Sequence, residues 1–261
     1  MSPRPPAIEA LAARPAMAAL VLDFDGVLAP IVDEPDAAAM PPPVAQSVAR
    51  LAAALGLLAV ISGRPAEFLA DRVRAPGARL LGSYGIEQIR DGTWELAPAA
   101  RAWLGAVDDA RSSLTYLAGR WPGVRIEVKP ASVAVHWRQA IDREAAAAAV
   151  REAGAKVAAQ TGLRAEPGKL VEELRPPIDV DKGSAVAALI AAEQPGAVAY
   201  AGDDLGDIPA LRAVRQAGGY ALVVDHGTET DQRLLDLADE VFAGTDGFAD
   251  WLAELAGRVA G

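Results

Sequence analysis

Two aspartates, Asp23 and Asp25, follow the apolar run 18–22 with one residue between them, and Gly26 comes directly after. The two carboxylates repel each other unless a positive group lies between them. Mg²⁺ is the natural partner, because it prefers oxygen ligands and uses one or two carboxylates alongside substrate phosphate. One aspartate could then attack phosphorus while the other transfers a proton. For these residues alone, a plain turn and a calcium loop are the alternatives.

A second group, Ser62-Gly63-Arg64-Pro65, follows the apolar run 57–61. At a junction between a strand and a helix, the Ser62 hydroxyl and neighbouring backbone N–H groups could bind a phosphate oxygen. Arg64 could add a forked, permanently charged donor. The alternative is a helix N-cap, with Ser62 as the capping residue and Pro65 in the first turn.

Lys182 lies at the start of a predicted helix, 182–192. Lysine usually prefers the other end of a helix, because the N-terminal end of the helix dipole is positive. A lysine here is favourable if it faces a phosphate or a group of carboxylates. The alternative is an ordinary exposed lysine.

Three carboxylates, Asp203, Asp204 and Asp207, follow the apolar run 197–201. Ligands of open α/β sheets gather at the carboxyl ends of the strands. Asp203 and Asp207 are four residues apart in the sequence. Both can therefore lie on one side of a loop and the following helical turn, and bind a cation directly or through water. The alternative is an acidic N-cap.

The composition limits the class of protein. The 261 residues are 52% hydrophobic, and 25 Lys and Arg against 35 Asp and Glu give a net charge of −10. This balance disfavours nucleic acid as a partner, because binding to a phosphate backbone requires clustered positive charge. The sequence has no cysteine and two histidines, which excludes disulfides, Cys–zinc sites and a histidine-rich metal site.

No apolar run approaches the roughly 20 residues that a membrane-spanning helix needs. Residues 1–19 lack the continuous apolar segment of a signal peptide. We therefore expect a soluble cytoplasmic protein, monomeric, that binds a small molecule and neither nucleic acid nor membrane.

Apolar runs alternate with segments of helical period in the first and last parts of the chain. This alternation predicts α/β structure, with a Rossmann-like parallel sheet covered by helices on both faces. Asp91-Gly92 predicts a tight hairpin between two of the strands. The expected strands are 19–23, 57–61, 79–81, 86–89, 93–96, 197–201, 220–224 and 241–242, and the expected helices are 44–55, 182–192, 207–214 and 245–255.

The middle of the chain has a different pattern. A helix over 99–119 precedes a β-β-α-β-β run, the pattern of a small α+β unit. Its expected strands are 124–128, 132–137, 163–166 and 170–174, around a helix over 141–160. We therefore predict three segments: 1–104 as the first part of the core, 105–178 as an inserted domain, and 179–261 as the second part of the core.

In their order along the chain, the acidic pair, the Ser-Gly-Arg group, the lysine and the acidic cluster resemble the four motifs of haloacid dehalogenase (HAD) superfamily phosphatases. The resemblance implies a Rossmann-like HAD core with an inserted α+β cap domain of the C2 type. It also implies that Asp23 is the nucleophile that forms an aspartyl-phosphate, and that Asp25 is the general acid and base.

The same resemblance implies which residues bind the phosphoryl group and the metal. Ser62 with Gly63, and Lys182, would bind the transferring phosphoryl group. The implied Mg²⁺ ligands are Asp23, the backbone carbonyl of Asp25, Asp203, and Asp207 through water or indirectly.

Longer segments are similar to the trehalose-6-phosphate phosphatase family over nearly the whole chain. They are Asp23 to Val32, Ile61 to Arg64, Gly82 to Glu87, Ile126 to Lys129, Ala134 to Arg138, Glu173 to Pro176, and Asp181-Lys182-Gly183. The resemblance implies that Glu127 and Lys129 contact glucose hydroxyls, with Glu173 and Arg64 as further substrate-binding candidates. For Glu127 and Lys129, an exposed strand face with two solvated charges is the alternative.

Three positions depart from this family's pattern, although none of them removes a catalytic group. Val27 stands where Thr is common, Tyr84 stands where His is frequent, and the last motif lacks its usual basic residue. The expected function is Mg²⁺-dependent hydrolysis of trehalose 6-phosphate to trehalose and phosphate. The alternatives are a phosphatase of sucrose, glucosylglycerate or mannosylglycerate phosphate, and a non-catalytic regulatory domain.

Overall fold

The computed structural model describes residues 5–32, 34–168 and 170–259, which divide into two units. Unit 1 comprises residues 1–95 and 180–261, and unit 2 comprises residues 96–179. The domain limits predicted from the sequence, at 104/105 and 178/179, stay a prediction. Their outer ends, residues 1–4 and 260–261, lie outside the described residues.

Unit 1 is built on one eight-stranded sheet in the order β12-β11-β10-β1-β2-β3-β4-β5. The neighbours from β12 to β3 are parallel, and β3 and β4 are antiparallel. The strands are β1 (Ala18–Asp23), β2 (Leu57–Ile61), β3 (Arg79–Gly82), β4 (Glu87–Arg90), β5 (Thr93–Leu96), β10 (Ala197–Gly202), β11 (Tyr220–Asp225) and β12 (Glu240–Ala243).

The continuous apolar runs follow from burial on both faces of this sheet. In β1, Leu20 and Leu22 pack into one core, whereas Ala19 and Val21 pack into the other. Successive side chains of a strand point to opposite faces, so a strand covered on both faces must be apolar at every position. All six positions of β1 are buried.

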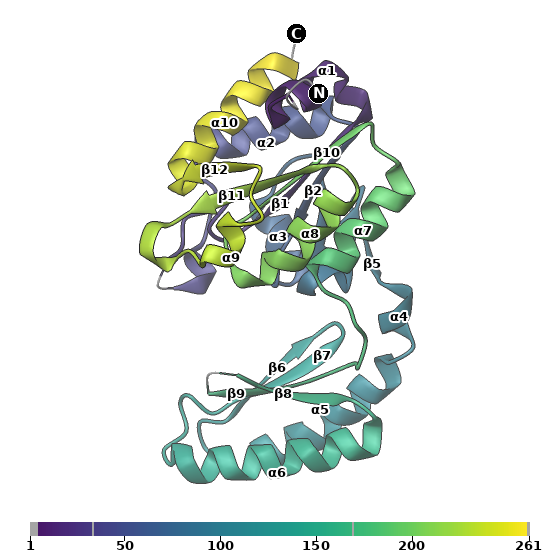
Figure 1. Cartoon of the computed structure of the whole chain (residues 1–261). Helices are drawn as coiled ribbons and strands as arrows, with labels where there is room; N and C mark the ends of the chain where they lie inside the picture. The colour runs from purple at the N-terminus through teal and green to yellow at the C-terminus, as the bar shows by residue number, and fades with distance from the viewer. Residues whose placement is uncertain (1–4, 33, 169, 260–261) are drawn as a thin grey trace. The chain divides into compact units, whose positions relative to one another are not determined.

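Helices cover the two faces of the sheet (Figure 1). On one face lie α1 (Ala7–Ala13), α2 (Pro42–Ala54), α3 (Ala66–Arg72) and α10 (Gly244–Val259). On the other face lie α7 (Lys182–Glu193), α8 (Ile208–Gln216) and α9 (Gln232–Leu235). Helix α1 was not predicted, because its seven residues offer too short a pattern to reveal a period.

The order of the strands determines where a ligand can bind. From β1 the chain proceeds outward through β2 and β3, and after unit 2 it returns to β10 on the other side of β1. The carboxyl ends of β1 and β10 therefore flank the point where the strand order reverses. In open α/β sheets this point is where ligands bind.

Unit 2 is a four-stranded antiparallel sheet, in the order β6-β7-β9-β8, with two long helices against one face. The β-β-α-β-β prediction is confirmed. The elements are α4 (Pro98–Arg101), α5 (Leu104–Ala118), β6 (Arg125–Lys129), β7 (Ser132–His136), α6 (Arg143–Thr161), β8 (Arg164–Gly168) and β9 (Val171–Arg175).

The single helix predicted over 99–119 is wrong, because the structure has two helices there. The break lies at Trp103, whose backbone leaves the helical region with φ −103° and ψ 0°. Its indole packs against the core of unit 2, next to Gly162. In the part of the chain that the structure describes, no helix combines the length and the apolar character needed to cross a membrane.

Candidate active site

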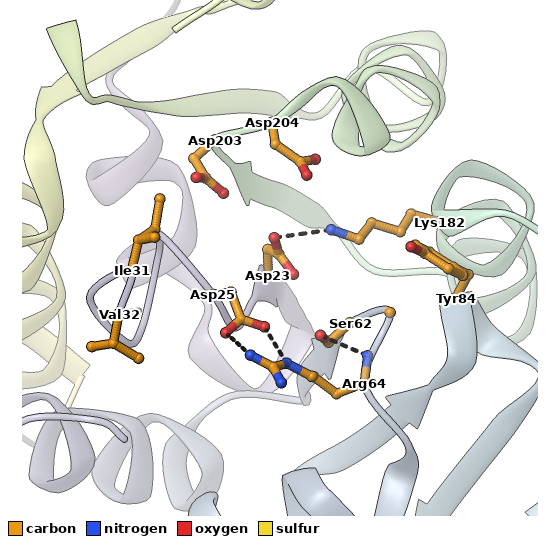
Figure 2. Close-up of a pocket in the computed structure, with 11 residues that line it drawn as sticks. Asp23, Asp25, Ile31, Val32, Ser62, Arg64, Tyr84, Lys182, Asp203 and Asp204 are labelled. Carbon is orange, nitrogen blue, oxygen red and sulfur yellow. Dashed lines mark hydrogen bonds and ion pairs between the residues drawn. The ribbon is translucent and has the colours of Figure 1, made fainter. Parts of the chain in front are cut away.

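A cavity of about 450 Å³ lies in unit 1 at the carboxyl ends of β1, β2 and β10 (Figure 2). The predicted motifs meet here because parallel strands bring their carboxyl ends to one edge of the sheet. The lining residues are Asp23, Asp25, Ile31, Val32, Ser62, Gly63, Arg64, Tyr84, Lys182, Asp203 and Asp204.

Lys182 is buried at the cavity and bonded to two carboxylates. Its side chain is 4% exposed, and Nζ lies 2.9 Å from Asp23 Oδ2 and 2.6 Å from Asp207 Oδ1. An ordinary exposed lysine is therefore excluded. Burial alone lowers the pKa of Lys182, but Asp23 and Asp207 reverse this effect and raise the pKa above its ordinary value. The lysine thus stays charged.

The start of helix α7 positions this lysine. The Ser184 N–H donates to Asp181 Oδ1 at 2.7 Å, so Asp181 caps the helix and Lys182 is its first residue. Gly183 is needed because a Cβ there would lie 2.6–2.7 Å from atoms of Pro209 in α8. The Lys-Gly sequence therefore lets α7 approach α8 closely while the lysine points to the sheet.

Asp207 is fully buried and accepts four hydrogen bonds. Lys182 Nζ and the Tyr200 hydroxyl donate to Oδ1, and the backbone N–H groups of Asp203 and Asp204 donate to Oδ2. Asp207 therefore fixes both the lysine and the loop after β10. Tyr200 was not predicted as part of the site; its signal was a single polar side chain within an apolar strand.

Asp203 has an oxygen without a partner. The residue is 8% exposed, and its Oδ1 is buried with no hydrogen bond among the described residues. Its Oδ2 lies 3.4 Å from His226 Nε2, and this nitrogen is 2.9 Å from the carbonyl oxygen of Gly26. Burial, with the neighbouring charges of Asp207 and Asp204, raises the pKa of Asp203 to about 7.

The carboxylates fit a divalent cation. Asp23, Asp203 and Asp207 each offer an oxygen, and these oxygens lie within 4.8 Å of one another. Burial raises the pKa of Asp23 above its ordinary value, and the charges of Asp207 and Asp203 add to this effect. The charge of Lys182 lowers the pKa but does not cancel the increase. Three carboxylates against one ammonium group leave an excess of negative charge, and an all-oxygen set suits Mg²⁺. Each oxygen of Asp207 already accepts two hydrogen bonds. Each oxygen of Asp23 has only one partner, Phe24 N–H or Lys182, and Asp203 Oδ1 has none among the described residues, so these two carboxylates can still bind a cation.

The Asp25 side chain lies apart from this cluster and pairs with Arg64. Arg64 Nε donates to Asp25 Oδ2 at 3.0 Å, and Arg64 Nη2 donates to Oδ1 at 2.9 Å (Figure 2). The pKa of Arg64 is raised by this hydrogen-bonded pair. In this structure Arg64, predicted to bind substrate, therefore binds the predicted acid–base residue.

Ser62 lies at the cavity but does not cap a helix. It is 2% exposed, and its Oγ accepts a hydrogen bond from the Arg64 N–H at 3.1 Å. Helix α3 begins after Pro65 and has no side-chain cap, so the capping alternative for Ser62 is wrong. Gly63 lies close to the ring of Tyr84, where a Cβ would be 2.7 Å from Tyr84 Cζ.

The predicted sugar-binding residues lie in unit 2. Val133 and Val135 of β7 face the helices, so the alternate residues of β7 face the other side of the sheet. Glu127 and Glu173 both pair with Ala134, and therefore share that side. We call this side the open face. By the strand register, its polar residues are Arg125, Glu127, Lys129, Ser132, His136, Arg164, Glu166, Glu173 and Arg175.

The open face carries three bonded groups, one of which is the pair of Arg175 and Glu166, whose Nη1 and Oε2 lie 3.2 Å apart. Lys129 Nζ lies 3.1 Å from Glu173 Oε1, which also accepts from the Ser132 hydroxyl. Glu127 Oε2 lies 2.8 Å from His136 Nε2. Burial alone raises the pKa of Glu173, but Lys129 and Ser132 outweigh burial and hold the pKa below its ordinary value. The charges of Lys129 and Glu173 are thus paired with each other, and Ser132 is a member of this group that was not predicted.

Comparisons with known proteins show the family of the chain. A family model described as "Trehalose-phosphatase" matches residues 21–238. The chain is 38% identical over 246 residues to a "Trehalose-phosphate phosphatase" of Mycobacterium marinum, which covers 89% of this chain. The chain spans 61% of the length of that relative.

Two solved structures share the fold. A "trehalose-6-phosphate phosphatase related protein" superimposes with a TM-score of 0.70 at 22% identity, covering 92% of this chain and 97% of that one. A haloacid dehalogenase-like hydrolase from Bacteroides thetaiotaomicron gives 0.60 at 16% identity, covering 91% and 99%. At these identities the likeness concerns the fold alone.

Proposed function

Because the chain belongs to the trehalose-phosphatase family, we propose that it hydrolyses trehalose 6-phosphate to trehalose and phosphate, with Mg²⁺ as cofactor. The observation that carries this proposal is the buried Asp23–Lys182 pair in a cavity where Asp203 has an unpartnered oxygen. A nucleophile, a fixed cation and an incomplete oxygen cluster are the parts that phosphoryl transfer requires.

Asp23 acts as the nucleophile and Asp25 as the acid and base. An Asp23 oxygen attacks phosphorus, the bond from phosphorus to the sugar oxygen breaks, and Asp25 donates its proton to that oxygen. An aspartyl-phosphate and free trehalose result. Asp25 then takes a proton from a water molecule as the water oxygen attacks phosphorus, which releases phosphate and restores the Asp23 carboxylate.

The phosphoryl oxygens bind Lys182 and the Ser62–Gly63 segment. Lys182 brings its positive charge next to Asp23, at 2.9 Å, so an anionic group can approach the anionic nucleophile. Asp25 must exchange at least part of its bidentate contact with Arg64 for the leaving oxygen. Arg64 is then free to bind a substrate oxygen, as the sequence predicted.

Mg²⁺ would be held by Asp23, Asp203 and the backbone carbonyl of Asp25. When bound, it would neutralise the charge shared by Asp23 and the phosphoryl oxygens. Asp207 serves this set indirectly, because its four hydrogen bonds fix Lys182 and the backbone that carries Asp203.

Glu127, Lys129 and Glu173 of the open face bind glucose hydroxyls. Carboxylates accept hydrogen bonds from sugar hydroxyls, and an ammonium group donates to them. Lys129 and Glu173 are held in place by their bond to each other, and Glu127 by its bond to His136. We also expect a monomeric cytoplasmic enzyme, and light scattering after size-exclusion chromatography tests the monomer.

A phosphate-release assay over a panel of sugar phosphates tests the proposal. Trehalose 6-phosphate is compared with sucrose, glucosylglycerate and mannosylglycerate phosphates, each with and without EDTA. We expect EDTA to abolish release and trehalose 6-phosphate to be preferred by more than about tenfold. A smaller preference would contradict the narrow substrate. Release from none of them would favour the regulatory domain.

The variant Asp23→Asn tests the covalent mechanism in the same assay. It is expected to lower turnover by about 10³-fold or more, because the amide cannot form the covalent intermediate. Circular dichroism should be unchanged, since the side chain keeps its size. Substantial activity in this variant would rule out the covalent mechanism.

A further inference from the structure

The segment Ser83–Gly85, next to the cavity, has a strained backbone. Ser83 and Tyr84 are consecutive non-glycine residues with φ of 50° and 61°, and Gly85 follows with φ of 99°. A bulky side chain rarely adopts this left-handed region. Such strain persists where the surroundings enforce it, and it clusters at functional sites.

The surroundings of this segment do enforce its conformation. The Tyr84 N–H donates to the Ser62 carbonyl at 2.9 Å, and the Ser83 N–H donates to the Arg64 carbonyl at 2.8 Å. The Ser83 hydroxyl bonds to Glu87, which is 1% exposed. The strained segment is therefore bonded along its backbone to the segment that carries the proposed phosphate ligands.

Packing of the Tyr84 side chain does not account for the strain. The residue is 41% exposed and belongs to none of the core clusters of the described residues. Instead, the hydroxyl end of the ring lies close to Gly63, where a Cβ would be 2.8 Å from the Tyr84 oxygen. Tyr84 lines the cavity together with Ser62 and Lys182 (Figure 2). The strained backbone thus places an aromatic ring on the cavity wall.

We propose that Tyr84 is a specificity-determining residue that contacts the sugar ring attached to the phosphoryl group. This inference rests on the proposed function. Asp23 and Lys182 are buried and receive the phosphoryl group. The exposed part of the cavity wall, which includes Tyr84, therefore contacts the sugar that is esterified to the phosphoryl group. A phenol ring offers an apolar face to the C–H groups of a sugar and a hydroxyl to its oxygens.

The variant Tyr84→Gly tests this role without threatening the fold. Glycine adopts positive φ freely, so the substitution removes the side chain and relaxes the backbone. Asp91→Gly is the matched control, because Asp91 also has positive φ, 51°, but lies in an exposed turn outside the cavity. Both variants are assayed with trehalose 6-phosphate and with acetyl phosphate, which has no sugar.

For Tyr84→Gly we expect the ratio of kcat/KM for trehalose 6-phosphate to that for acetyl phosphate to fall by about 10- to 100-fold, mainly through KM. Inhibition by trehalose should weaken by a similar factor. Asp91→Gly should leave the ratio unchanged. An unchanged ratio in Tyr84→Gly, or the same fall in Asp91→Gly, would overturn the proposal.

The wild type in the same assay separates the two possible failures. If it does not hydrolyse trehalose 6-phosphate, the proposed function fails. The ratio is then measured with the sugar phosphate that the wild type hydrolyses best. A fall in that ratio supports the role of Tyr84, and an unchanged ratio overturns it.

Discussion

The carboxylates of Asp23, Asp203 and Asp207 together carry more negative charge than the ammonium group of Lys182 neutralises. Lys182 bonds to Asp23 and Asp207, whereas Asp203 keeps an oxygen that is buried without a partner. A buried acceptor in this state costs about 1–3 kcal/mol. A cation that bound this site in the folded state would therefore stabilise the fold.

Asp203→Asn tests this link between the metal and stability. Saturating Mg²⁺ should raise the melting temperature of the wild type by about 5 °C or more, because a ligand at a hundred times its Kd contributes about 2.7 kcal/mol. In Asp203→Asn the rise should nearly vanish. The metal-free variant should be at least as stable as the wild type, since the amide removes a buried charge.

Differential scanning calorimetry with and without MgCl₂ measures both effects. Asp250→Asn, on the exposed surface of α10, is the control and should respond to Mg²⁺ like the wild type. An equal response in Asp203→Asn would mean that Asp203 is not a ligand.

Sequence patterns revealed the charged residues of the site better than their partners. Lys182 was predicted from its unusual place at a helix start, and the structure buries it between carboxylates. Tyr200 and His226 were not predicted. Tyr200 is one polar residue in an apolar strand, and its bond to Asp207 depends on the fold of the loop after β10. His226 lies beside Asp203 and Gly26, which are both distant from it in the sequence. The pairing of Arg64 with Asp25 spans 39 residues, and no local spacing predicts it.

Within the elements, the loop after β1 depends on a glycine for two reasons. Gly26 has φ of 77°, and a Cβ there would lie 2.0 Å from Asp203 Oδ2. Gly92 also has positive φ, 75°, but has nothing within 4 Å of such a Cβ. A substitution at Gly92 would therefore cause backbone strain alone, whereas one at Gly26 would cause backbone strain and a steric clash.

Gly26→Ala should therefore be far more harmful than Gly92→Ala. Both variants bear a backbone penalty of about 1 kcal/mol. Gly26→Ala must also displace Asp203, so we expect weaker Mg²⁺ binding and a loss of about 100-fold in kcat/KM. Titration of activity with MgCl₂ measures this effect. Equal behaviour of the two variants would mean that the Asp203 contact is unimportant.

The fold class was predictable because strand and helix periods differ clearly in this chain. The HAD-like core with an inserted α+β unit is confirmed. Asp91-Gly92 predicted the hairpin through turn chemistry, and both residues have positive φ. The break at Trp103 was not predictable, because it depends on where one indole packs in the finished unit.

Glu173 of β9 makes unit 2 sensitive to acid. Its pKa lies below the ordinary 4.5, so its contribution to stability is present above that pH and is lost as the pH falls through the folded-state pKa. Near pH 6 we expect the free energy of unfolding of the wild type to be larger than that of Glu173→Gln by on the order of 1 kcal/mol. Near pH 3 this difference should vanish, because Glu173 is then protonated. Calorimetry of the unit 2 transition measures the difference.

Glu152→Gln, an exposed change on α6, is the control for that titration. It should parallel the wild type at both pH values. A stability advantage of the wild type over Glu173→Gln that stayed constant with pH would mean that the bonds from Lys129 and Ser132 do not depend on the Glu173 charge.

Each hydrophobic core of the molecule is formed by residues of one unit only. The apolar cluster of unit 2 is formed by residues between 103 and 174, and both clusters of unit 1 lie outside that range. The metal-binding candidates, Asp23, Asp203 and Asp207, all belong to unit 1. Each unit therefore has its own source of cooperativity, and one of them has the proposed ligand site.

We accordingly expect calorimetry to resolve two unfolding transitions, of which Mg²⁺ shifts one. Leu114→Ala removes a fully buried side chain from unit 2. It should lower the free energy of unfolding of unit 2 by about 2–5 kcal/mol, and with it the temperature of that transition. Leu222→Ala does the same in unit 1. The transition that Mg²⁺ raises should be the one that Leu222→Ala lowers, and Leu114→Ala should leave it in place. A single transition lowered by both substitutions would mean that the units unfold together, so that a ligand bound in unit 1 also stabilises the open face of unit 2.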